Sequence, residues 1–475
     1  MQLLNYLWPP EKIMKKTFTV LSKTSVVAAI ALLMTLPSLR LLAQEDDGTD
    51  TTTTQKAVPA QPRFSLHFQT TYIYQYKPAF SADYSGQNSM KTQEETDNSI
   101  TATLYMGMRL WKGAELYINP EIAGGSGLSG AYGMAASTNG ETFRVGDPSP
   151  TLYLARGYLK QTINLDHGKD TTMGDGQNQV QSKYSRRSLT FYLGKFSLGD
   201  LFDNNIFATG PRTTFLNWCF MNNGAWDYAA NLRGYTYSFT TVLSWNNMSY
   251  KAALATMPVV ANGPDLNTNL SHEYAINTEV TRSFKLHKKD GHLRLLGYYN
   301  NADMGNYKEA IAEAPIGGVP NVVSTRWYFR DKYGFGLNFD QQLTETLGIF
   351  ARAGWNDGHN ETWCFTEADQ SISAGISLNG AGWKRKDDNI GVAIVVNGLS
   401  KEHEHYLADG GLGFQLGDGA LNYANETVAE CYYSYRPKIV NGLWLSADYQ
   451  FALNPGYNQD RGPVSVFSVR VHVEL

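Results

Sequence analysis

The sequence predicts an all-β protein whose strands close into a transmembrane antiparallel barrel of about 16 strands. Three observations lead to this prediction. Residues 464–475, like many earlier stretches, alternate an apolar face with a charged or polar one. The connections between such stretches alternate between short and long, and an apolar secretory segment begins the chain. A bilayer admits strands only as a closed barrel, because an open edge would leave backbone N–H and C=O groups without partners.

Composition agrees with one large barrel. The 475 residues include 29 Tyr and 44 Gly, with a formal charge of −4. A single barrel can absorb this length as one unit. The near-neutral charge argues against a nucleic-acid-binding protein, which would carry a basic stripe. Cys219, Cys364 and Cys431 are odd in number, far apart and match no metal spacing, so we predict no role for them.

The N-terminal residues 1–43 are predicted to be a signal peptide, with Met14 as an alternative start. Lysines precede an apolar run at residues 25–36, and a small-residue site would leave Gln44 first in the mature chain. A membrane anchor is the alternative, but the run is shorter than the roughly 20 residues that a spanning helix needs. Residues 44–62 are acidic, rich in Thr and without periodicity, which predicts a disordered leader. The barrel domain is then 63–475.

Sixteen stretches carry the period of two that is typical of strands with unlike faces. Their parity predicts that Leu337, Phe339 and Leu445 face lipid while Asp340 and Asp448 face inward. The predicted strands are residues 64–76, 99–111, 114–122, 152–163, 188–195, 233–245, 249–257, 271–285, 291–300, 333–343, 346–355, 371–379, 389–397, 426–436, 442–453 and 464–475.

The lengths of the connections give an independent indication. Bacterial barrels have short periplasmic turns and long external loops. With both termini on the periplasmic side, the even connections should be short and the odd ones long. The short ones are 112–113, 246–248, 286–290, 437–441 and the neighbourhood of Glu345, and the long ones are 77–98, 123–151, 196–232, 301–332 and 398–425. Residues 164–187 are long where a short turn belongs; we interpret them as a periplasmic insertion, with a miscounted strand as the alternative.

One long stretch resembles the carbohydrate-selective porins, the OprB-like family. It is GKFSLGDLFDNNIFATGPRTTFLNWCFMNNGAWDYAANLRGYTY at residues 194–237. Further similar stretches, in the same order, extend the resemblance over nearly everything after residue 63; they are 115–130, 334–343, 351–358 and 454–472. The chain departs from the pattern at 164–187 and at Leu475, where such barrels usually end in an aromatic residue.

The resemblance implies a sixteen-stranded barrel in the bacterial outer membrane that passes small sugars by passive diffusion. It also implies contact with outer-membrane lipid, with lipopolysaccharide and with the barrel-assembly machinery, and a monomer or a homotrimer. General or anion-selective porins, and a structural or adhesive barrel with a plugged lumen, remain alternatives.

The third long connection, residues 196–232, agrees with this implication. It is too aromatic for a solvated loop and too polar for a core, which predicts a third extracellular loop folded into the lumen as a constriction. Aromatic faces can lie against the C–H faces of a pyranose while charged and amide groups hydrogen-bond its hydroxyls. Packing on the wall for stability alone is the alternative. The predicted solute contacts are Asp200, Asp203, Arg212, Asn217, Trp218, Asn223, Trp226 and Asp227.

Charged residues of both signs are predicted by parity to line the lumen wall. Such a mixture suits neutral polyhydroxylated solutes better than a ring of one sign, which would select ions. For any one of these residues, an ion pair with a wall neighbour is an equal alternative. They are Arg109, Glu121, Arg294, Asp340, Arg352, Glu430, Asp448 and Arg470.

Signals for catalysis are poor, so no enzyme activity, cofactor or metal is predicted. The segment from Glu402 to His405 alternates Glu and His, but it lies in a predicted external loop and lacks a third partner. No nucleophile and His occur together at a predicted rim. An energy-coupled transporter would need a plug and 22 strands.

Overall fold

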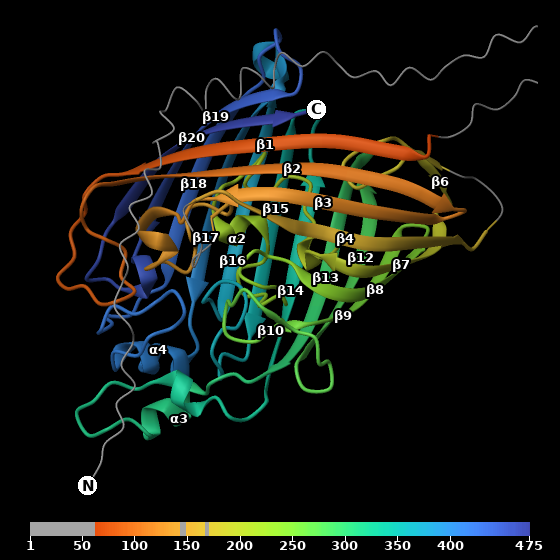
Figure 1. Cartoon of the computed structure of the whole chain (residues 1–475). Coiled ribbons are helices and arrows are strands. Elements are labelled where there is room, and N and C mark those ends of the chain that lie inside the picture. The colour runs from red at the N-terminus through yellow and green to blue at the C-terminus, as the bar shows by residue number, and fades with distance from the viewer. Residues whose placement is uncertain (1–61, 143–148, 167–170) are drawn as a thin grey trace, which may run out of the picture. The chain divides into compact units, whose positions relative to one another are not determined.

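Sixteen strands pair into one closed antiparallel barrel in the computed structural model, which describes residues 62–142, 149–166 and 171–475 (Figure 1). The predicted signal peptide and nearly all of the predicted leader lie outside the described residues. The barrel strands are β1 (Phe64–Lys77), β2 (Glu95–Trp111), β3 (Ala114–Gly124), β4 (Thr151–Asn164), β7 (Arg187–Phe196), β8 (Thr236–Trp245), β9 (Met248–Ala255), β12 (Tyr274–Leu286), β13 (Lys289–Ala302), β14 (Arg330–Gln342), β15 (Leu347–Asn356), β16 (Gln370–Gly380), β17 (Arg385–Gly398), β18 (Glu426–Tyr435), β19 (Leu443–Leu453) and β20 (Val464–Glu474).

The first and last strands close the barrel. β1 pairs antiparallel with β20 from Gln69 opposite Glu474 to Tyr76 opposite Phe467. β20 pairs with β19 on its other side, so neither of its edges is open. Each strand of the barrel thereby has a neighbour on both sides, as a bilayer requires. The prediction of a closed barrel of 16 strands is confirmed.

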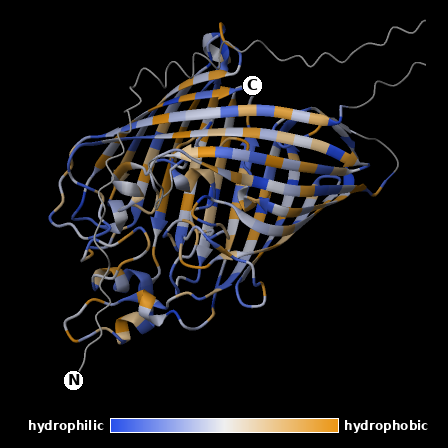
Figure 2. Ribbon diagram, viewed as in Figure 1, coloured by the Kyte–Doolittle hydropathy of each residue, from blue (hydrophilic) through white to orange (hydrophobic). Residues whose placement is uncertain are grey.

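The two faces of the strands differ as the sequence pattern predicts. Leu337 on β14 is 40% exposed on the outer face, while its near neighbour Asp340 is fully buried inside. Leu445 and Asp448 on β19 differ in the same way. Hydrophobic and hydrophilic residues alternate along many strands (Figure 2). The alternation follows from the strand period of two, which sends successive side chains to opposite faces.

Short turns and long connections lie at opposite ends of the barrel. The connections of residues 112–113, 246–247 and 287–288 are tight, and Gly113 and Asn246 take the positive φ angles that such turns require. The long connections contain most of the helices, and α3 and α4 lie together at one end (Figure 1). The helices are α2 (Trp218–Met221), α3 (Tyr307–Ala312) and α4 (Lys401–Ala408), with 3-10 turns η1 (Leu128–Ala131), η2 (Leu198–Asp200), η3 (Val322–Thr325), η4 (Ala381–Trp383) and η5 (Pro455–Tyr457). None of the helices in the described ranges has the length and apolar character needed to cross a membrane.

The described part of the insertion between β4 and β7 contributes no strand to the barrel, and β4 pairs directly with β7. It contains a separate hairpin of β5 (Thr171–Met173) and β6 (Ser182–Tyr184). A miscounted strand is therefore excluded here. A second small sheet, β10 (Met257–Pro258) with β11 (Leu266–Asn267), lies in the connection between β9 and β12.

Candidate functional site

The connection between β7 and β8, residues 197–235 and here called the third loop, is bound to charged side chains on the inner wall. Arg352 of β15 donates hydrogen bonds to the carbonyl oxygens of Phe220, Asp203 and Ala208 at 2.7, 3.1 and 3.2 Å. Its guanidinium also lies 2.9 Å from the Asp203 carboxylate. One wall residue thus fixes three points of the loop, because the planar guanidinium offers five donors in a fixed geometry.

Two further strands bind the other half of the third loop. Arg470 of β20 donates to the carbonyl oxygens of Pro211 and Thr214, both at 2.6 Å. Glu430 of β18 accepts hydrogen bonds from the backbone N–H groups of Leu216 and Asn217. Since β15, β18 and β20 lie along different parts of the wall, these bonds hold the loop against the inner face of the barrel.

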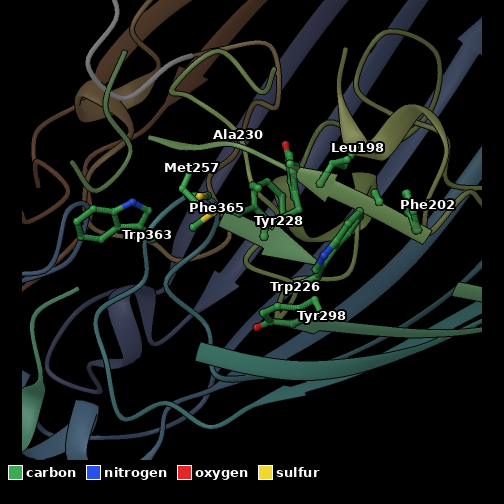
Figure 3. Close-up of a cluster of buried hydrophobic side chains, with 14 of the residues drawn as sticks. Leu198, Phe202, Trp226, Tyr228, Ala230, Met257, Tyr298, Trp363 and Phe365 are labelled. Atoms are coloured by element: carbon green, nitrogen blue, oxygen red, sulfur yellow. The ribbon is translucent and has the colours of Figure 1, made fainter. Parts of the chain in front are cut away.

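Aromatic side chains give the third loop its own apolar core. Phe202, Trp226 and Tyr228 pack with one another and with residues of other connections, among them Trp363 and Phe365 (Figure 3). The Trp226 indole N–H donates to Asn277 of β12 at 2.9 Å, so its polar atom is also satisfied. The loop is therefore a packed element and not a solvated strap.

A cavity of about 410 Å³ lies between the third loop and one sector of the inner wall. Its lining includes side chains from β2, β3 and β4, from the third loop, and from the connection between β3 and β4. It also reaches Gln177 of the insertion and Glu474 at the end of β20. The charged and aromatic lining residues are Tyr105, Glu121, Glu141, Arg156, Asp200, Asp203, Arg212, Tyr228, Arg233, Tyr235 and Glu474.

Ion pairs between arginine and carboxylate side chains lie along this cavity. Arg212 lies 2.9 Å from both Glu121 and Glu141, and its side chain is 19% exposed toward the cavity. Burial alone would lower the pKa of Arg212, but the Glu141 and Glu121 carboxylates hold it well above its ordinary value. Arg156 binds Asp200 through two hydrogen bonds of 2.7 and 2.6 Å. Each guanidinium group therefore keeps its positive charge, and the carboxylates paired with it offset part of that charge at the cavity surface.

Aromatic hydroxyls and rings complete the same wall. The hydroxyl groups of Tyr153 and Tyr235 both donate to Glu121. The guanidinium of Arg233 lies 4.1 Å from the centre of the Tyr153 ring, and that of Arg156 lies 5.2 Å from the centre of the Tyr235 ring. The cavity thus offers donors, acceptors and aromatic surface within one continuous network.

The predicted contact residues of the third loop divide into two groups. Asp200, Asp203 and Arg212 line the cavity. The others are buried away from it. Asn217 caps α2 by accepting from the Cys219 N–H, and Trp218 stacks on a phenylalanine. The remaining buried residues are Asn223, Trp226, which is 1% exposed, and Asp227, which accepts from three successive backbone N–H groups at positions 363–365.

The predicted wall residues all lie on the inner side, but their environments differ. Arg352, Glu430 and Arg470 bind the third loop, and Asp448 lies buried on β19 near Arg470. Arg294 and Asp340 pair with each other at 2.6 Å. The last two are Glu121, which lines the cavity, and Arg109, which donates to the Gln181 carbonyl of the insertion.

Several residues of the cavity lining, or in contact with it, were missed by the sequence analysis. Arg156 and Tyr153 both face inward because the register shifts between Asn119 and Pro120, which leaves Ala155 as an extra residue in β4. A β-bulge of this kind breaks the period of two, so simple parity fails there. Pro120, which cannot donate to the ladder, is the one local signal of the bulge. Glu141 lies in a connection without periodicity and had no signal.

In the Glu–His segment at the start of α4, His403 makes contacts that stabilise the fold. His403 is buried, with its Nδ1 3.0 Å from Asp369, and its ring stacks on Tyr307. Within the ranges that the structure describes, no three His, Cys, Asp or Glu side chains are grouped as ligands for a metal ion.

A closed antiparallel barrel of sixteen strands, with a long loop on its inner wall and a polar cavity beside that loop, defines the class of the porins. The chain belongs to the carbohydrate-selective porin, OprB family, whose model matches residues 87–475. The resemblance found in the sequence is thereby confirmed. The family is one of outer-membrane channels, with a preference for carbohydrates at the level of the family.

The solved structure of an OprB porin agrees with this fold, and other outer-membrane channels show a weaker likeness. OprB of Pseudomonas putida is similar with a TM-score of 0.66 and 16% sequence identity, covering 87% of this chain and 94% of that one. The outer-membrane channel DcaP of Acinetobacter baumannii has a TM-score of 0.46 at 9% identity, covering 87% and 97%. OccK2 (OpdF) of Pseudomonas aeruginosa, solved in complex with glucuronate, has a TM-score of 0.44 at 9% identity, covering 87% and 98%. No curated protein matches the chain.

Proposed function

We propose that this porin passes small, neutral carbohydrates by passive diffusion through the cavity beside the third loop. One observation carries the proposal: Arg212 and Arg156 are each paired with carboxylates at the cavity surface, beside tyrosine side chains. A sugar presents hydroxyl groups that both donate and accept, together with apolar C–H faces. Such a solute can exchange hydrogen bonds with a network of paired charges without requiring a counter-ion.

The balance of charge argues against the anion-selective alternative. Five carboxylates and three guanidinium groups line the cavity. One of the carboxylates, Asp203, is paired with Arg352 behind the loop. The remaining excess of acidic groups gives an anion no favourable field, whereas a neutral solute is indifferent to it.

The extent of the cavity argues against a plugged lumen. Besides the third loop, it contacts Gln177 and Glu474 at the end of the barrel where β1 begins and β20 ends. A second cavity, of about 510 Å³, is lined by the same two residues and by Leu475. Two cavities that share lining residues favour a continuous passage.

The predicted contact residues take different parts in this proposal. Asp200, Asp203 and Arg212 meet the solute, while Asn217, Trp218, Asn223, Trp226 and Asp227 give the loop its shape. The apolar outer face meets outer-membrane lipid and lipopolysaccharide, and the barrel-assembly machinery inserts the chain. A monomer and a homotrimer are both compatible with the proposal, which requires no cofactor and no catalytic step.

Single-channel recording in planar bilayers tests the proposal, with mono- and oligosaccharides titrated against the wild type and the variant Arg212→Gln. We expect wild-type current to be blocked by sugars and the variant to bind them more weakly. Arg212→Gln removes one positive charge from the cavity surface. The partition of a small ion into the cavity, at about 4 Å from that charge, should change by about fivefold, because the Coulomb energy in water is about 1 kcal/mol at that distance.

The matched control is Arg330→Gln, which breaks an Arg–Glu pair with Glu309 outside the cavity lining. It should change neither sugar block nor ion selectivity. The proposed function would be contradicted if the wild-type protein gave no current in the bilayer, or if its current were insensitive to every sugar. If sugars block the Arg212→Gln and Arg330→Gln variants equally, Arg212 is not part of the sugar-binding site.

A further inference from the structure

The insertion between β4 and β7 forms a narrow hairpin with a defined tip. β5 pairs with β6 from Thr171 opposite Tyr184 to Met173 opposite Ser182. Beyond this ladder, Gly176 and Gln179 exchange two backbone hydrogen bonds of 3.0 Å. Asn178 takes a positive φ of 53°, which suits a tight hairpin turn. The tip is therefore shaped by its own backbone.

This hairpin folds back onto the inner wall of β1. Asp175 lies 3.1 Å from the imidazole of His67, and the side chain of Gln177 donates to that of Gln69 at 3.1 Å. The hydroxyl of Ser65 donates to the Gly176 carbonyl at 3.3 Å. All three wall residues alternate along one strand on the face opposite the exposed Leu66, so the contacts are made inside the barrel.

The returning half of the hairpin is fixed on β2 and β3. Val180 is fully buried against Tyr117, and its N–H donates to the Tyr117 hydroxyl at 3.1 Å. The next residue, Gln181, accepts from Arg109 of β2 through its carbonyl. Three consecutive strands thus hold the hairpin near the end of the barrel where the short turns lie.

The tip contacts open space on both sides. Gln177 lines the cavity beside the third loop and also the second cavity, and Gly176 lines the second one. A Cβ atom built on Gly176 would meet nothing within 4 Å. A solute that leaves the first cavity toward this end of the barrel therefore passes the hairpin.

We propose that the β5–β6 hairpin is a second constriction, in series with the third loop, and that Gln177 hydrogen-bonds the hydroxyl groups of a passing solute. The inference rests on the proposed channel function and adds a separate element to it. The side-chain amide can both donate and accept, which matches a hydroxyl group without favouring an ion of either sign.

A shortened variant tests the size of this constriction. Because Thr171 pairs with Tyr184, residues 172–183 can be replaced by an Asn-Gly turn that keeps the strand register. We expect ion conductance to rise by up to about twofold, since removing one of two comparable resistances in series can do no more. Sugar block at the third loop should persist.

Charge variants at the tip test whether passing ions meet the hairpin. If the hairpin had only a structural role, these variants would leave ion selectivity unchanged. Gly176→Lys should shift selectivity toward anions and Gly176→Glu toward cations, each without a change in barrel folding. The matched control is Gly382 in the short turn between β16 and β17, where an added Cβ also meets nothing within 4 Å. Gly382→Lys and Gly382→Glu should leave selectivity unchanged.

The outcomes separate the two proposals. If wild type conducts and is blocked by sugars, but neither the shortened variant nor the charge variants differ from it, the second constriction is refuted and the channel function stands. If wild type leaves the bilayer sealed and the shortened variant does too, both proposals are refuted together.

Discussion

Replacing Arg352 by Met should release the third loop while leaving the barrel closed. Arg352 binds three loop carbonyls and the Asp203 carboxylate from one buried position on β15. Met fills a similar volume but offers no donor. The β15 ladder to β14 and β16 is made by backbone groups, so it does not depend on this side chain.

The expected magnitude follows from the burial of the pair. Both partners are 2% exposed, and removing one member of a buried ion pair costs about 3–5 kcal/mol because the other charge is left without compensation. At 1.4 kcal/mol per factor of ten, local opening of the loop should become more frequent by at least about a hundredfold. The loss acts on the loop and not on the whole barrel.

Hydrogen exchange of the loop amides measures this opening directly. In Arg352→Met, the segment from Asp203 to Phe220 should exchange far faster, single-channel current should become noisier, and sugar affinity should fall. Arg352→Lys should be intermediate, because an ammonium can pair with Asp203 but lacks the fork of donors. Arg282→Met is the matched control, since Arg282 is exposed and bonds only to Asn247 among the contacts described. Unchanged exchange in Arg352→Met would refute the view that wall charges anchor the loop.

Two further perturbations test the packing of the loops. Trp226→Ala should cost about 3–5 kcal/mol of local stability, because it empties a buried site in the core of the third loop; loop amides should exchange faster and sugar affinity should fall, and retained protection with lowered affinity would instead indicate direct stacking on the solute. Asp369 responds to pH: burial would raise its pKa, but His403 and Lys332 bring it below its ordinary 3.8. Its stabilising contribution is therefore present above pH 3.8 and is lost as the pH falls through the lower folded pKa, which exchange of the Ser400 amide, a donor to Asp369, should report. Asp369→Asn should remove this dependence, and an unaltered profile would contradict the assignment.

The architecture could be predicted because its signals are local and repeated. A strand with a period of two and a turn of two residues are visible in a short window, and sixteen of them leave few alternatives. The inward position of Arg352, Glu430 and Arg470 followed from parity alone. Their contacts did not, because each binds a segment more than a hundred residues away in sequence.

The cavity was harder to predict for three physical reasons. The bulge at Ala155 reverses the parity of one strand, so Arg156 was not assigned to the wall. The partner of Arg212 in the connection between β3 and β4, Glu141, lies in a stretch with no periodicity, and only tertiary packing brings the two together. Aromatic residues also carry an ambiguous signal: Trp226 packs inside the loop, whereas Tyr235 lines the cavity.

The pairing of β1 with β20 has a consequence for the order of biosynthesis. Thr71 and His472, which are hydrogen-bonded across this seam, are 401 positions apart. Until the last strand is available, β1 has one unsatisfied edge, and such an edge recruits other strands and promotes aggregation. Because the entropy of closing so long a chain must be lost before the final ladder forms, closure is expected to be a late and slow step. The chain therefore has to be kept apart from other unfolded chains from the synthesis of residue 64 until residue 474 has followed.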